Sequence, residues 1–183
     1  MSVLSQLPED EALNIIALPY QAGMWISHAD DVHGDSDDFK EMRAIERGIP
    51  ALAAQHESSA LVQAVASEIM RMKDQWPSWE DGCFHVTKRA PDLMQRVLGT
   101  FGESEAKQYR AFTLELGKLV AQAASEFEAF DEAQEEKESF FGNLIGKITG
   151  SYAAMGQDNA GHPANISASE KGALSQLSAA LKI

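Results

Sequence analysis

The sequence predicts an all-α protein, and three observations support this fold class. In most segments apolar residues recur three and four positions apart, as they do on the buried face of a helix. No segment of useful length alternates apolar and polar residues as a half-buried strand does. Several segments also begin with residues that cap a helix or match its dipole. We therefore expect a compact bundle of about six to eight helices.

Prolines mark the first and third expected helices. The first helix begins near Pro8, and Pro19 should bend or divide it, because a proline inside a helix removes a backbone hydrogen bond. The third helix carries apolar residues from Leu61 to Trp76. It should end at Pro77, which restricts the backbone of the residue before it.

The second expected helix follows an acidic stretch. Asp35 or Ser36 can cap its first turn, and the acids that come next suit the positive end of the helix dipole. Gly48 and Pro50 should break or kink this helix. The apolar residues that it should turn inward are Phe39, Met42, Ile45 and Ile49.

The most regular apolar spacing runs from residue 103 to about residue 130 and predicts a central, buried helix. A shorter helix should precede it, from Pro91 to a stop at Gly99 or Gly102. Residues 131–148 then repeat the design of acids followed by an apolar face. The residues expected in the core include Ile45, Leu61, Val65, Ile69, Tyr109, Phe112, Leu116, Leu119, Val120, Phe141 and Leu144.

These segments should form one domain over residues 1–150, because 183 residues with 44% apolar content supply one ordinary core. Residues 151–166 are rich in small, turn-forming residues and are interpreted as a linker. Residues 167–183 predict a final helix, in which Ser167 and Glu170 have the spacing of a capping box. We expect this helix to dock on the domain, with a partner protein or a second copy of the chain as the alternative.

Charge and composition limit the classes of partner. The formal net charge is −13, which opposes nucleic-acid binding, since phosphates are neutralised by clustered lysine and arginine. Membrane insertion is not expected either, because no apolar run approaches the roughly 20 residues that span a bilayer. The single cysteine, Cys83, excludes an intramolecular disulfide, and acids stand where a secretory signal would be positive. We expect a cytoplasmic protein with a protein partner, and a homodimer as the alternative.

The stretch SHADDVHGDSDD, residues 27–38, is dense in aspartate and holds two histidines. Its carboxylates suit calcium or magnesium, but Val32 and Gly34 stand where an EF-hand loop needs oxygen ligands. A second interpretation is a transition-metal site, for which the chain must turn between the two histidines. A third is a solvated turn, and a weakly bound divalent cation is the only cofactor expected. The candidate metal ligands are His28, Asp30, Asp31, His33 and Asp35.

Sequence signatures of enzymes are mostly missing: there is no His-Glu-x-x-His motif, phosphate loop or Gly-x-Ser-x-Gly. Cys83 lies two residues from His85, and a nearby imidazole can activate a thiolate. A small, buried and inert cysteine is the favoured interpretation. Trp76 and Trp79 either form a recognition surface or, as aromatic residues beside a proline turn usually do, close one end of the core.

Two segments of the chain resemble the TerB-like family, named for tellurite resistance. Each segment has an apolar helix, an acidic turn and a helix that opens with acids: GMWISHADDVHGDSDDFKEMRAI and KLVAQAASEFEAFDEAQEEKESFFGNLIGKI. By position, the acids of the family's turns correspond to Asp30 and Asp31 in the first unit and to Glu126, Glu128 and Asp131 in the second. Neither turn contains the family's Asp-Gly pair.

The resemblance covers roughly residues 15–148 and implies a compact helical fold in which this unit occurs twice. It also implies stress response, metal-ion sensing at acidic surfaces and assembly with other proteins. We therefore expect a non-enzymatic binding protein. The alternative is a metal-dependent helical enzyme that uses His28, Asp30, Asp31 and His33.

Overall fold

The computed structural model describes residues 2–30, 36–126, 146 and 166–183, and it confirms the all-α class for them, with no β-strand in these ranges. The α-helices are α1 (Glu9–Ser27), α2 (Ser36–Gln55), α3 (Ala60–Arg71), α4 (Trp76–Trp79), α5 (Val86–Glu126) and α7 (Ala168–Ala180). The 3-10 turns are η1 (Val3–Gln6) before α1, η2 (His28–Asp30) after it, and η3 (Lys73–Gln75) and η4 (Glu80–His85) on either side of α4. The second acidic unit, with the expected core residues Phe141 and Leu144, lies outside the described residues.

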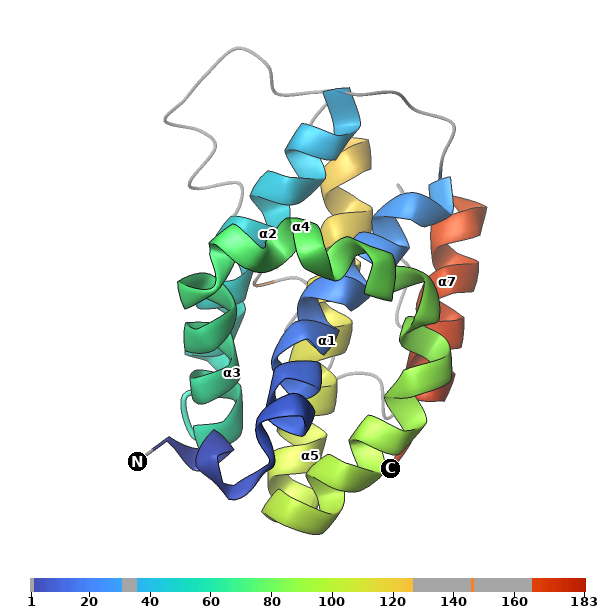
Figure 1. Cartoon of the computed structure of the whole chain (residues 1–183). Coiled ribbons are helices and arrows are strands. Elements are labelled where there is room, and N and C mark those ends of the chain that lie inside the picture. The colour runs from blue at the N-terminus through green and yellow to red at the C-terminus, as the bar shows by residue number, and fades with distance from the viewer. Residues whose placement is uncertain (1, 31–35, 127–145, 147–165) are drawn as a thin grey trace.

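Helix α1 lies at the centre of the bundle, with α2 and α3 on one side and α7 on the other (Figure 1). Its side chains are buried without interruption from Ile15 to Met24, so this segment has no solvent-facing side. Three acids in its first turn suit the positive end of the helix dipole.

Pro19 was predicted to bend or divide the first helix, and it lies inside α1 without dividing it; a bend stays a prediction. A proline at this position leaves the carbonyl oxygen of Ile15, four residues earlier, without its helical hydrogen bond. The hydroxyl of Tyr109 on α5 donates to that oxygen at 2.7 Å. The helix therefore continues through the proline because a side chain from another helix replaces the missing donor.

Helix α2 passes through Gly48 and Pro50 to Gln55, so it is not broken there; a kink, the other form of the prediction, stays a prediction. Gly48 is buried where α2 lies against α5, and its lack of a side chain gives room to Leu116 and Leu119. The glycine thus serves close helix packing here and does not act as a helix breaker.

Gly48→Ala should lower the free energy of unfolding by about 1–3 kcal/mol, because the added methyl group would overlap the buried side chain of Leu119. Gly99→Ala is the matched control, since a Cβ at this helical glycine meets no atom within 4 Å. The control should raise stability by about 0.5–1 kcal/mol. Denaturant unfolding of both variants measures the difference, and changes of the same sign would contradict the close contact of α2 with α5.

The third helix ends earlier than predicted, at Arg71, and Pro77 does not terminate it. Pro77 stands instead in the first turn of α4, where proline is well tolerated. Trp76 and Trp79 are buried, and their rings lie 4.8 and 5.8 Å from the ring of Tyr20 in α1. The two tryptophans therefore close one end of the core, as the favoured interpretation held.

Helix α5 has two arms that meet at Gly102, whose φ of 84° requires the left-handed region that glycine adopts readily. The predicted stop at Gly102 is confirmed, whereas the start is at Val86 and not at Pro91. The second arm returns through the bundle beside α1 (Figure 1). As predicted, it is buried at Tyr109, Phe112, Leu116, Leu119 and Val120.

Helix α7 begins with the predicted capping box, in which the side chains of Ser167 and Glu170 bond each other's backbone N–H groups. Leu177 and Leu181 are fully buried, and the helix packs on α5 and α1. Arg110 of α5 also donates a hydrogen bond to the Ser178 hydroxyl at 3.2 Å.

Candidate functional site

The predicted metal-binding stretch lies only partly within the described residues. His28 and the backbone of Asp30 belong to η2, whereas Asp31, His33 and Asp35 lie outside. Across the described ranges, no group of three or more His, Cys, Asp or Glu side chains is arranged to hold a metal ion. The metal hypothesis therefore stays a prediction.

The side chain of His28 takes part in an aromatic contact at the surface. Its ring stacks on Phe84 with centroids 5.5 Å apart and an interplanar angle of 20°. Phe84 is 65% exposed, far more than the other large apolar residues that reach the surface in the described part of the chain. Two exposed acids, Glu80 and Asp81, lie in the same 3-10 turn. We call the set His28, Glu80, Asp81 and Phe84 the aromatic–acidic surface.

A polar chain between α1 and α5 fixes the turn that carries Phe84. Gln21 donates to the carbonyl oxygen of Trp79 at 2.9 Å and accepts a hydrogen bond from Arg89, which also bonds Asn14. Gly82 passes so close to Gln21 that a Cβ there would overlap the amide. Phe84 is thus exposed on a turn whose base is held by buried polar contacts.

Cys83, next to Phe84, does not have the surroundings of a nucleophile. Its side chain is fully buried, and burial raises the pKa of the thiol, which disfavours the reactive thiolate. His85 is exposed. The interpretation of Cys83 as a small buried group is the one that fits its position.

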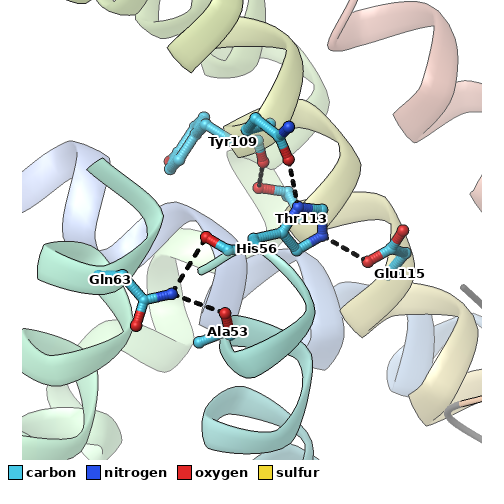
Figure 2. A network of polar contacts seen from close by, with 7 residues as sticks. Ala53, His56, Gln63, Tyr109, Thr113 and Glu115 are labelled. Carbon is cyan, nitrogen blue, oxygen red and sulfur yellow. Dashed lines mark hydrogen bonds and ion pairs between the residues drawn. The ribbon is translucent and has the colours of Figure 1, made fainter. Parts of the chain in front are cut away.

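A second polar site lies inside the bundle, around His56 in the turn between α2 and α3 (Figure 2). His56 is 7% exposed, and its Nε2 lies 2.8 Å from Glu115 Oε2 on α5. Its Nδ1 lies 2.5 Å from Gln108 Oε1, also on α5. The ring of Phe112 contacts the imidazole edge to face. We call His56, Gln108 and Glu115 the buried histidine triad.

Neighbouring contacts hold the same turn to the bundle. Gln63 of α3 donates to the carbonyl oxygens of Ala53 and His56, as Figure 2 shows. Ser59 caps α3 and donates its hydroxyl hydrogen to Glu105, which also accepts a bond from the backbone N–H of Leu61. Two carboxylates of α5 therefore bind the turn at separate points.

Comparisons of the chain with protein-family models, with curated proteins and with solved structures give no match. In the described part of the chain, none of the helices combines the length and apolar character needed to cross a membrane.

The buried histidine triad was not predicted, although the sequence contains a signal for it. Glu115 stands three residues after Phe112 and four before Leu119, which places its carboxylate on the buried face of the central helix. A buried carboxylate needs a charged or hydrogen-bonding partner. Which of the five histidines meets it depends on how α2 packs against α5, and the sequence pattern does not contain that information.

Proposed function

We propose that this protein is a non-enzymatic binding protein whose aromatic–acidic surface contacts a basic segment of a partner protein. The observation that carries this proposal is the exposure of Phe84, at 65%, while its ring is stacked on His28. A single exposed apolar residue is common on protein surfaces. Here the ring is held by a stacking partner on a well-anchored turn, so little conformational freedom would be lost on binding.

The chemistry of this surface favours arginine in the partner. A guanidinium group can stack on an aromatic face and bond carboxylates at its edge, whereas lysine offers a compact charge. Glu80 and Asp81 supply exposed carboxylates in the same 3-10 turn as Phe84. The net charge of −13 would attract a basic partner over a longer range and speed its association.

The resemblance to the TerB-like family extends this proposal in two ways. It suggests that the protein works in the cytoplasm during a stress response, and that divalent ions at the acidic stretch adjust its binding. This extension rests on the resemblance, whereas the binding surface rests on Phe84 and its neighbours.

Phe84→Ala should weaken binding of an arginine-rich model peptide about five- to tenfold, which corresponds to the roughly 1 kcal/mol expected for a cation–π contact. Leu13→Ala is the matched control, because Leu13 is also an exposed apolar residue but lies on α1. Calorimetric titration of both variants, with a lysine peptide of equal length as comparison, gives the affinities.

The proposal predicts that arginine peptide binds more tightly than lysine peptide and that this preference is lost in Phe84→Ala. Equal binding of the two peptides, unaffected by either substitution and abolished by moderate salt, would show attraction by net charge alone. That result would refute the aromatic–acidic surface as a binding site.

A further inference from the structure

Both ring nitrogens of His56 face hydrogen-bond acceptors. Nε2 meets a carboxylate oxygen of Glu115, and Nδ1 meets the amide oxygen of Gln108. A neutral imidazole has one N–H donor and one acceptor, so it can satisfy only one of these contacts. A doubly protonated ring satisfies both and places a positive charge 2.8 Å from the carboxylate.

We propose that the buried histidine triad is a pH-sensitive latch, in which protonated His56 fastens the turn between α2 and α3 to the second arm of α5. When the proton leaves, one ring nitrogen becomes an acceptor and the ion pair with Glu115 is lost. Gln108 must then turn its amide so that its nitrogen donates to the ring. The latch thus has a charged, tightly bonded form and a neutral form with weaker contacts.

The charges around His56 favour the protonated form. Burial by itself lowers the pKa of His56, but the hydrogen bonds that its ring donates to Glu115 and Gln108, with the charge of Glu115, outweigh it, so the pKa is raised. On the same helix, Glu105 binds the turn through Ser59, and Lys118 is close enough for Glu115 to act on its charge. Among the described residues of α3, the side chain that bonds the turn is that of Gln63, and its amide is uncharged.

The sign of the pH dependence follows from this raised pKa. Below the unfolded-state pKa of about 6.5, His56 is protonated in both states and the latch contributes its full stability. As the pH rises through the higher folded-state pKa, the folded protein loses the proton and the contribution disappears. Between the two pKa values the folding equilibrium constant should fall by up to tenfold per pH unit.

The first test measures the latch itself. In nitrogen NMR spectra of the full chain at pH 6.5, near the ordinary pKa of histidine, the ring of His56 should carry protons on both nitrogens in more than half of the molecules. The ring-nitrogen signal that disappears in His56→Gln belongs to His56. If this variant does not fold, contacts between the ring and Phe112 identify the signal. A His56 ring that is already neutral at pH 6 would overturn the proposal.

The second test measures its effect on stability between pH 5.5 and 8.5. Wild type should lose stability relative to His56→Gln as pH rises, and Glu115→Gln should flatten the profile in the same way. His85→Gln, which removes an exposed histidine, should keep the wild-type profile. Parallel stability profiles of wild type and His56→Gln would overturn the proposal. Hydrogen exchange of the amides of residues 56–63 gives a second readout, because their protection, corrected for intrinsic rates, should fall as the pH rises. Protection that does not fall would also overturn the proposal.

Discussion

Leu116→Ala should lower the free energy of unfolding by roughly 2–5 kcal/mol, the range expected when a packed leucine site is emptied. Leu116 is fully buried on the second arm of α5, and with Leu119 it is one of the two side chains that lie against Gly48 of α2. The cavity would lie between two helices whose backbones are already close, so the site can collapse little. The cost should therefore exceed that of transferring the lost methyl groups to water.

Denaturant unfolding at constant pH measures this cost. Leu13→Ala serves as the control, since Leu13 is partly exposed on α1 and its truncation should change stability by less than about 0.5 kcal/mol. Equal, small effects of the two substitutions would mean that the inward face of α5 has been assigned wrongly.

Removal of residues 167–183 should destabilise the remaining bundle and promote its association. Leu177 and Leu181 are fully buried against the bundle, and burying two leucines contributes roughly 3–6 kcal/mol before the cost of ordering the helix. Truncation would expose the apolar surface around Gly117 and Ile26, which lies under Leu177. Exposed apolar patches of this kind drive self-association.

We would measure the thermal midpoint and the light-scattering mass of the truncated protein and compare them with those of the full chain. A shorter deletion of Lys182 and Ile183, both exposed, is the control and should change neither quantity. An unchanged midpoint and mass after the longer deletion would show that α7 contributes nothing to the bundle.

The helices were predictable from local patterns, whereas Pro19 does not divide α1 and Gly48 does not break α2. Local rules state that Pro19 removes a hydrogen bond. They do not state that Tyr109, distant in the sequence, donates to the freed oxygen of Ile15. The role of Gly48 also depends on a distant segment, because Leu116 and Leu119 belong to a helix that only the tertiary structure brings near.

The candidate sites differ in the same way in how far the sequence predicts them. The metal site in the acidic stretch was predicted from residue types alone, and its Asp31, His33 and Asp35 lie outside the described residues. The exposure of Phe84 and the pairing of His56 with Glu115 depend on packing between distant segments. Helical periodicity predicts that Glu115 is buried, but it does not predict that His56 is its partner.

The central position of α1 has a consequence for the protein during its synthesis. This helix leaves the ribosome before α5 and α7, which pack against it and come later in the chain. At typical elongation rates the stretch from residue 28 to residue 180 takes on the order of ten seconds or more to appear. During that interval the segment of α1 from Ile15 to Met24, which is buried on all sides in the folded protein, lacks the surfaces of α5 and α7, so the nascent chain is an expected client for chaperones that shield apolar segments.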